Sequence, residues 1–385
     1  MTTAGWIGYA FVGLAVIAIA YQLIALVAVR RYFARAAPRS TSREPVTILT
    51  PLHGDEPELA ANLASFLMQD YGGAVQMVCG VGSPDDSAIA AVARLQAAHP
   101  EGAIDLVTGP RANGANAKIG NIVAMMPAAS HDLLVLSDSD MAVERNYLAA
   151  LVAALDQPGV GAVTCLYSGR GDAGWWSRIS AAAMSYTGLP NMVMALSTSI
   201  AQPCLGSTIA IRRETLGALG GFTRFADVLA DDYAIGEAVA ALGQRVAVPP
   251  MLLTHGCAHR SLAEAWRQHL RWSVTIRGVA PLRHAGSGIT HALAFALLAV
   301  PFLPLAGGAL TLLALAVRLT LAGTVDRIAG VRQRFIWLVP LADLLEFAAF
   351  CASFTARAID WRGSRLIMAD RRRIAHRTST ATEIS

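Results

Sequence analysis

Charged residues are scarce in this sequence. Asp, Glu, Lys and Arg together make up 15% of its 385 residues, whereas 54% of the residues are hydrophobic. A typical soluble domain has about 25% charged residues, so this composition indicates a membrane protein. The length is sufficient for one large domain or for two of ordinary size.

Lysine is almost absent, and cysteine occurs without a metal-binding or redox spacing. Lys118 is the only lysine, so nearly all of the positive charge is arginine, and the net charge is +4. The five cysteines are far apart in the chain: Cys79, Cys165, Cys204, Cys257 and Cys351. This scatter excludes a Cys-x-x-Cys zinc or dithiol motif, and we interpret the cysteines as reduced core thiols that face the cytosol. We expect no nucleic-acid partner.

The N-terminal region is a predicted membrane anchor. Residues 5–29 include no charged residue, and a helix needs about 20 apolar residues to cross a bilayer. Arg30, Arg31 and Arg35 follow directly, which places that end of the anchor in the cytoplasm. A cleaved signal peptide is the alternative, but no basic residues precede the apolar run and it is too long for such a peptide. We therefore expect an anchor over residues 1–32.

A second apolar region runs over residues 289–324. Pro301, Pro304 and neighbouring glycines interrupt it. It is too long for one straight helix, so two short spans joined by a tight turn are expected here.

A third apolar region covers residues 335–355 and includes Asp343 and Glu346. Carboxylates inside a span should face protein or water instead of lipid. We group residues 289–356 as C-terminal transmembrane helices.

The chain ends in a basic tail, residues 357–385, which includes Arg371, Arg372 and Arg373. A hairpin plus one further span would place the tail outside, whereas the positive-inside rule places it in the cytoplasm. The sequence leaves this topology open.

Residues 44–260 form a predicted cytoplasmic domain in which strands and helices alternate. Apolar, β-branched runs predict strands over residues 46–50, 75–82, 104–108 and 133–138. Helical periodicity covers residues 58–69 and 88–98. Such alternation predicts an α/β domain with a mostly parallel sheet, in which ligands bind beyond the carboxyl ends of the strands.

Acidic residues follow three of these strands. They are Asp55 with Glu56, Asp85 with Asp86, and Asp138 with Asp140. Two like charges at a strand end repel each other unless a cation neutralises them, and carboxylate oxygens suit Mg²⁺ or Mn²⁺. A solvated turn that caps the next helix is the alternative, because a bare Asp-x-Asp matches by chance.

Two further polar motifs lie downstream. Asp231 and Asp232 begin a predicted helix, where they serve either as capping residues or as a general base. Gln268, Arg271 and Trp272 share one helix face, because they are three and four residues apart.

The region around this last motif, residues 261–288, is basic and aromatic, which predicts interfacial amphipathic helices. An arginine fork suits a diphosphate.

The order of these motifs resembles that of the ceramide glucosyltransferase family of inverting GT-A glycosyltransferases. The segments that carry the resemblance are "PLHGDEPEL" (51–59), "NAKIGN" (116–121), "VLSDSDM" (135–141), "LADDYAIG" (229–236) and "QHLRW" (268–272). The resemblance is greatest to the bacterial branch that acts in hopanoid biosynthesis. It implies a GT-A, Rossmann-like fold between the apolar segments.

The resemblance also implies a role for each candidate residue. Asp138 and Asp140 would hold Mg²⁺ or Mn²⁺ with the diphosphate. Asp232 would be the catalytic base, next to Asp231, where the family usually has Glu. The nucleotide-sugar would contact Asp85 or Asp86 at its uracil, and otherwise Glu56, Lys118, Gln268, Arg271 and Trp272.

The implied reaction is the transfer of N-acetylglucosamine from its UDP-sugar to a hydroxyl of bacteriohopanetetrol, a lipid of the bilayer. A ceramide glucosyltransferase using UDP-glucose is the first alternative, and a processive polysaccharide synthase is the second. A transporter would need its acids inside the spans instead of the polar domain. The charge-free stretch 180–207 is either core or a lipid-facing gate. We expect a multi-pass protein of the bacterial inner membrane with a cytoplasmic catalytic domain.

Overall fold

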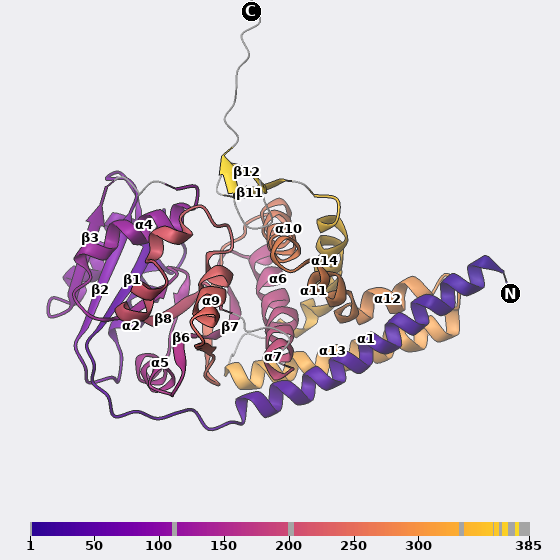
Figure 1. Ribbon diagram of the computed structural model, residues 1–385. Helices are drawn as coiled ribbons and strands as arrows, with labels where there is room; N and C mark the ends of the chain where they lie inside the picture. Colours follow the sequence, from indigo (N-terminus) through magenta and orange to yellow (C-terminus); the bar gives the residue numbers. More distant parts are fainter. Residues whose placement is uncertain are drawn as a thin grey trace, which may run out of the picture.

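An α/β domain and a projecting bundle of apolar helices make up the computed structural model (Figure 1). It describes residues 2–109, 114–198, 204–330, 335–356, 358–361, 364–368 and 374–376. Helices α1, α12 and α13 extend away from the sheet, and the N-terminus lies at the far end of this bundle.

A seven-stranded sheet organises the α/β domain. Its strand order is β3 (Ala103–Thr108), β2 (Val75–Val81), β1 (Val46–Leu52), β4 (Leu133–Ser137), β8 (Thr208–Arg212), β6 (Val160–Thr164) and β9 (Arg245–Ala247). The first four are parallel, and β8 is antiparallel to both of its neighbours. The predicted strands and the mostly parallel sheet are confirmed.

A second, three-stranded sheet lies beside the first. It consists of β5 (Met141–Ala142), β10 (Leu252–Cys257) and β7 (Leu166–Gly171). Because β5 begins directly after Asp140 and pairs with β10, this sheet brings a segment more than 100 residues downstream to the end of β4.

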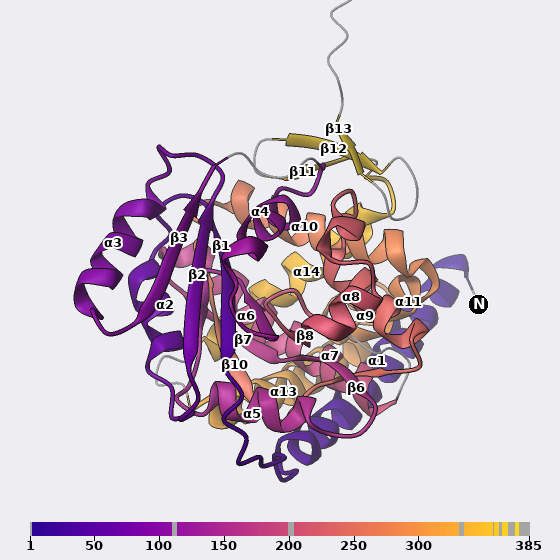
Figure 2. The same cartoon turned by 60° about the vertical axis from the view of Figure 1, so that its left-hand side comes forward.

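Helices cover both faces of the large sheet, as Figure 2 shows for α3 and α4. Side chains alternate along a strand, so Ile48 packs into one core and Leu49 into the other. The first core is covered by α2 (Leu59–Leu67), α3 (Ala88–Ala98) and α5 (Tyr147–Leu155); the second is covered by α4 (Ala117–Met125), α8 (Arg213–Ala218) and α9 (Asp231–Ala241). Each fully buried aromatic or aliphatic side chain, such as Phe66, contributes about 1.5–3 kcal/mol.

The apolar regions form α1 (Thr3–Phe33), α12 (Ala292–Ala299), α13 (Pro304–Ala329), the 3₁₀ turn η5 (Ile336–Leu338) and α14 (Val339–Ser353). The two helices expected over residues 289–324 are present as α12 and α13, joined by a short turn. The break lies where the prolines predict it, but α12 has only eight residues, or about 12 Å of helix. Three described helices are long and apolar enough to cross a membrane: α1, α13, and the combined segment of η5 and α14.

Small residues let the helices of this bundle approach closely. Ala15 and Ala18 of α1 pack against Ala292 and Ala296 of α12. A Cβ on Gly8 would lie 2.7 Å from the Cβ of Phe302, so this position requires glycine. Close backbone contact of this kind is how helices associate where lipid removes the hydrophobic driving force.

Polar side chains of the apolar helices face the protein, as predicted for Asp343 and Glu346. Arg318 of α13 donates to Asp343 of α14 (Nε to Oδ2, 2.7 Å) and to the carbonyl of Tyr186. Glu346 pairs with His269. These contacts satisfy charges that would be costly against lipid.

A π-helical turn, η2 (Met184–Gly188), joins α6 (Trp175–Ala183) to α7 (Leu189–Ser197) and supplies Tyr186. Residues 199–203 of the charge-free stretch lie outside the described residues. Much of the described part of that stretch is buried and packs against α1 and α13, whereas Ser197 and Thr198 are exposed.

The remaining elements are η1 (Met126–Ala128), η3 (Phe222–Phe225), α10 (Leu262–Val279), α11 (Pro281–Gly286), η4 (Ser287–Thr290) and an antiparallel sheet of β11 (Ala358–Trp361), β12 (Ser364–Met368) and β13 (Ile374–His376). This small sheet was not expected in the basic tail. Arg371, Arg372 and Arg373 lie outside the described residues.

We expect Arg318→Met to lower the free energy of unfolding by about 3–5 kcal/mol, because Asp343 then stays buried without its partner. Unfolding in detergent, followed by circular dichroism, measures this loss. The double variant Arg318→Met/Asp343→Leu removes both charges and should recover most of the stability. A double variant that is no more stable than Arg318→Met would contradict this account.

Candidate active site

A cavity of about 920 Å³ opens beyond the ends of β1 and β4, which is the size of a typical small-molecule site. Of the predicted site residues it is lined by Glu56, Lys118, Asp138, Asp140, Asp231, Asp232, Gln268, Arg271 and Trp272. Segments that are more than 200 residues apart in sequence therefore meet in one place, whereas Asp85 and Asp86 are not part of this lining.

Asp138 and Asp140 project from the turn that follows β4. The backbone N–H of Asp138 donates to the carbonyl of Ser207 (3.2 Å), which fixes the turn against the strand β8. Ser139, between the two acids, donates its hydroxyl to Glu56 (2.6 Å). Glu56 is thereby held at the cavity wall by the same turn that presents the two aspartates.

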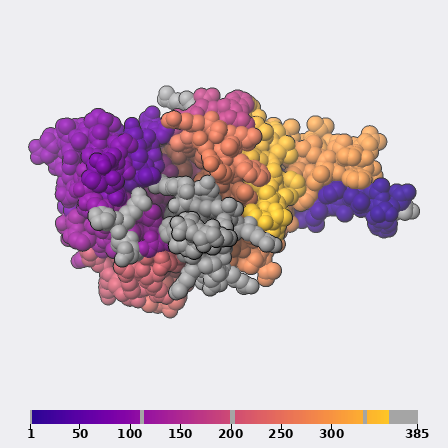
Figure 3. All heavy atoms as spheres, turned by 90° about the horizontal axis from the view of Figure 1, so that it is seen from above, coloured from indigo at the N-terminus to yellow at the C-terminus, as the bar shows by residue number. Residues whose placement is uncertain are grey.

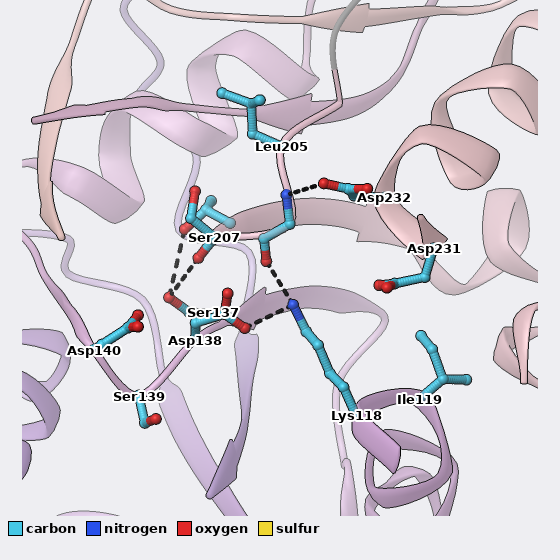
Figure 4. A network of polar contacts seen from close by, with 12 residues as sticks. Lys118, Ile119, Ser137, Asp138, Ser139, Asp140, Leu205, Ser207, Asp231 and Asp232 are labelled. Carbon is cyan, nitrogen blue, oxygen red and sulfur yellow. Dashed lines mark hydrogen bonds and ion pairs between the residues drawn. The ribbon is translucent and has the colours of Figure 1, made fainter. Parts of the chain in front are cut away.

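Lys118 is the positive centre of this acidic site (Figure 4). Its Nζ lies 2.6 Å from Oδ1 of Asp138 and donates to the carbonyl of Gly206 (2.8 Å). Asn116 caps α4 by accepting from the backbone N–H of Lys118, which sets the direction of the side chain. Although burial opposes the charge, Asp138 and Asp231 raise the pKa of Lys118.

The two aspartates at the start of α9 have different environments. Asp231 is buried and accepts from Nδ2 of Asn116 (3.1 Å). Asp232 accepts from the backbone N–H of Gly206 (2.9 Å) and of Tyr233 (2.7 Å). Burial and, next, the charge of Asp231 raise the pKa of Asp232 to about 6, in spite of these bonds and of Lys118. A carboxylate with such a pKa is ionised at neutral pH and accepts a proton more readily than an ordinary one.

The predicted face of α10 is confirmed, since Gln268, Arg271 and Trp272 all line the cavity. Nη2 of Arg271 donates to the side-chain oxygen of Gln268 (3.0 Å). The Trp272 ring meets His269 edge to face, with 5.5 Å between centroids. The guanidinium and indole are thus held in fixed positions over the acidic end of the cavity.

Asp86 does not line the cavity but contacts His53, which does. It accepts from the backbone N–H of Gly54 (2.8 Å) and of Ala88 (3.0 Å), and its Oδ2 lies 3.4 Å from Nδ1 of His53. Although burial opposes its charge, these bonds and His53 lower the pKa of Asp86. Asp85 is exposed. Only His53 of this group lines the cavity.

Sequence reasoning missed His255, which also lines the cavity. Its Nε2 lies 3.4 Å from Oδ2 of Asp140, and its ring lies beside Tyr167, with 5.4 Å between centroids. No motif marks this histidine in the sequence. The pairing of β10 with β5 places it there.

The donor atoms at Asp138 and Asp140 fit a divalent cation. Carboxylate oxygens are hard ligands, and Mg²⁺ usually takes one or two of them together with substrate phosphates. Within the described ranges, no cluster of three or more His, Cys, Asp or Glu side chains is arranged to hold a metal by itself. A cation held by Asp138 and Asp140 would therefore complete its coordination with other ligands, such as a substrate diphosphate. His255, beside Asp140, would orient that carboxylate.

The chain was compared with known families and structures. The model of glycosyl transferase family 21 matches residues 10–374. A mannosyltransferase, PcManGT from Pyrobaculum calidifontis in complex with GDP-Man and Mn²⁺, is similar, with a TM-score of 0.53 and 23% identity over 90% of this chain and 99% of that chain. Glucosyl-3-phosphoglycerate synthase from Mycobacterium tuberculosis has a TM-score of 0.35 and 20% identity, over 66% of this chain and 78% of that chain. The first likeness confirms the expected GT-A-like fold.

We expect Lys118→Met to lower the free energy of unfolding by about 1–3 kcal/mol, because Asp138 and the Gly206 carbonyl lose their donor. Chemical unfolding of the purified protein measures the change. Lys118→Arg is the matched control, since it keeps the charge and should lose less. Equal stability of Lys118→Met and the unsubstituted protein would contradict a structural role for this charge.

Proposed function

Because the chain belongs to glycosyl transferase family 21, we propose that this glycosyltransferase moves a sugar from a UDP-sugar to a hydroxyl of a membrane lipid, with inversion at the anomeric carbon. One observation carries the proposal. Asp138 and Asp140 lie on one side of Lys118, and Asp232 lies on the other (Figure 4). An inverting transfer needs this separation, because the base acts on the face opposite the leaving group.

On the donor side, Asp138 and Asp140 would hold Mg²⁺ or Mn²⁺ together with the diphosphate. The complex of the Pyrobaculum enzyme with GDP-Man and Mn²⁺ supports a nucleotide-sugar and a metal here. When bound, the cation neutralises charge on the diphosphate as it leaves. Arg271 and Gln268 donate to the same group, and charge-assisted bonds from a guanidinium are the stronger kind. Trp272 closes this end of the cavity.

On the acceptor side, Asp232 takes the proton of the attacking hydroxyl. That hydroxyl is a poor nucleophile while protonated, so removal of the proton during attack contributes a rate factor of about 10²–10⁴. The two N–H bonds from Gly206 and Tyr233 fix the carboxylate without neutralising it. Asp231, bonded to Asn116, supports Asp232 through its charge instead of accepting the proton itself.

The acceptor is a lipid, because apolar helices α1 and α13 border the domain that holds the site. Within that class we propose a hopanoid polyol, bacteriohopanetetrol, as the acceptor and UDP-N-acetylglucosamine as the donor, on the basis of the motif resemblance. Ceramide with UDP-glucose is the alternative pair. We place the enzyme in the bacterial inner membrane, with its catalytic domain in the cytoplasm.

The proposal is tested by giving the purified enzyme in lipid nanodiscs both donors with both lipids. Product chromatography and UDP release are measured for each pair. Transfer of N-acetylglucosamine to the hopanoid alone supports the full assignment, and glucosylation of ceramide alone selects the alternative. A polymeric product, or equal transfer to a water-soluble sugar, would refute a lipid glycosyltransferase.

We expect kcat/KM to fall about tenfold for each pH unit below about 6, the pKa of Asp232, because the base must be deprotonated. Because the pKa is raised, the loss of activity begins below about pH 6, and activity reaches its plateau above this pH. Asp232→Asn keeps the shape but accepts no proton, so it should lose a factor of about 10²–10⁴ in rate while UDP-sugar binding persists. A variant with an unchanged rate would move the base elsewhere.

We expect Asp140→Ala and His255→Ala to weaken Mn²⁺-dependent UDP binding, the histidine variant by about 10–100-fold. Isothermal titration of UDP with and without Mn²⁺ separates the metal effect from folding. The control is Asp70→Ala, an exposed carboxylate paired with Arg145 and outside the cavity lining. Undiminished activity in excess chelator would show that these side chains do not hold a metal.

A further inference from the structure

The segment of η5 and α14 carries an exposed apolar stripe. Its exposed positions recur every three or four residues, which places them on one face of a helix. They are Trp337, Leu341, Leu344, Ala348, Cys351 and Phe354. The opposite face holds the buried polar residues Asp343 and Ser353. The polar face is therefore turned to protein, and the apolar face is turned outward.

Both ends of this segment are held by the catalytic domain and the helices next to it. At its start, the backbone N–H of Phe335 donates to the hydroxyl of Tyr186 (3.2 Å). At its end, Nε2 of His284 lies 2.8 Å from Oγ of Ser353, and Arg277 of the site helix α10 donates to the carbonyl of Ala356 (2.8 Å). A helix that crossed the bilayer would have one end on the far side from this domain.

The position of α14 relative to the other apolar helices agrees with this. Viewed from above, the yellow atoms of α14 lie against the coral atoms of the α10 region, whereas α1, α12 and α13 project beyond them (Figure 3). The strand β11, which follows α14, contacts α10. The chain thus returns to the catalytic side after α14.

Two exposed tryptophans lie side by side at the start of the α14 segment. Trp175 of α6 and Trp337 of η5 have ring centroids 5.0 Å apart and remain 47% and 58% exposed. Tryptophan is enriched where a membrane meets water, because its ring is apolar and its N–H is polar. One ring comes from the catalytic domain and the other from the start of the α14 segment.

We infer that α14 lies in the plane of the cytoplasmic membrane surface, with its apolar stripe in the boundary between headgroups and acyl chains. In this arrangement α1 crosses the membrane, and α12 and α13 form a hairpin beside it whose two ends both lie on the cytoplasmic side. Contacts of Gln22 with Thr290, of Gly8 with Phe302 and of Arg30 with Thr324 place this hairpin along α1. An in-plane helix buries its apolar face about 5–10 Å into this boundary. The inference goes beyond the proposed reaction and does not depend on which sugar or lipid is used. It also leaves the basic tail on the cytoplasmic side, which the positive-inside rule favours.

The helix α14 also contacts α10, the helix that carries part of the active site. His269 of α10 pairs with Glu346 of α14 and, through Nε2, with Ser180 of α6 (3.2 Å). Trp272, one helical turn further on, lines the cavity. A helix resting on the membrane surface is therefore joined directly to the helix that carries the site, and it fixes the depth at which a lipid hydroxyl meets Asp232.

The test is a matched depth measurement by spin labelling of the full chain in liposomes. Cys351 is exposed and the other four cysteines are buried, so the native protein is labelled at Cys351. Leu344→Cys in a Cys351→Ser background provides a second position on the stripe, seven residues away. Ile17→Cys and Ile24→Cys, in the same background, are the control pair on the exposed face of α1, also seven residues apart.

Collision with oxygen and with a water-soluble nickel chelate gives the depth of each label. We expect positions 344 and 351 to lie at the same shallow depth within about 3 Å, whereas positions 17 and 24 should differ by about 10 Å, the rise of seven helical residues. A difference of about 10 Å between 344 and 351 would overturn the in-plane assignment. A green fluorescent protein fused to the C-terminus should fluoresce in cells; a dark fusion at full expression would also overturn it. Neither readout requires activity, so failure of the proposed reaction stays distinguishable.

Discussion

Repulsion between carboxylates is the constraint on which the arrangement of this site depends. Asp138 follows β4, whereas Asp231 and Asp232 begin α9, and all three line one cavity. Buried like charges raise each other's pKa and would separate without a counter-charge. Lys118 supplies it by joining Asp138 to the Gly206 carbonyl, while the N–H of Gly206 holds Asp232. Lys118 and the backbone of Gly206 therefore keep the donor and base sides of the cavity at a fixed separation.

The parts of the fold that could be predicted depend only on short segments of the sequence. Strands β1 and β4 are rich in apolar and β-branched residues, and the acids Glu56, Asp138 and Asp140 that follow them line one cavity because parallel strands end at the same edge of a sheet. The prominence of Lys118 could be predicted from its being the only lysine, and the shared face of Gln268, Arg271 and Trp272 from helical spacing. Each of these inferences needs only a few consecutive residues.

The parts that could not be predicted depend on distant pairings. The antiparallel insertion of β8 and the approach of His255 to Asp140 follow from sheet contacts between segments far apart in sequence. Local periodicity carries no information about them. The same limit applies to residues 289–324. Proline marks where a helix stops, but local sequence does not show that α12 has only eight residues and packs against α1.

The helix α10 lines the active-site cavity and also contacts α14. Residues 268, 271 and 272 line the cavity, whereas His269 and Val274 are buried outside this lining. Because a helix is rigid, a contact on its buried side fixes the position of the cavity side. His269 makes that contact with α14, whose polar groups face the protein while its outer stripe is apolar. Loss of the His269–Glu346 pair would therefore change the depth and orientation of Arg271 and Trp272 before it changed their chemistry. The charge that is buried in an apolar helix thus links the catalytic cavity to the membrane surface, and this explains why Glu346 occurs in a segment where lipid alone would exclude it.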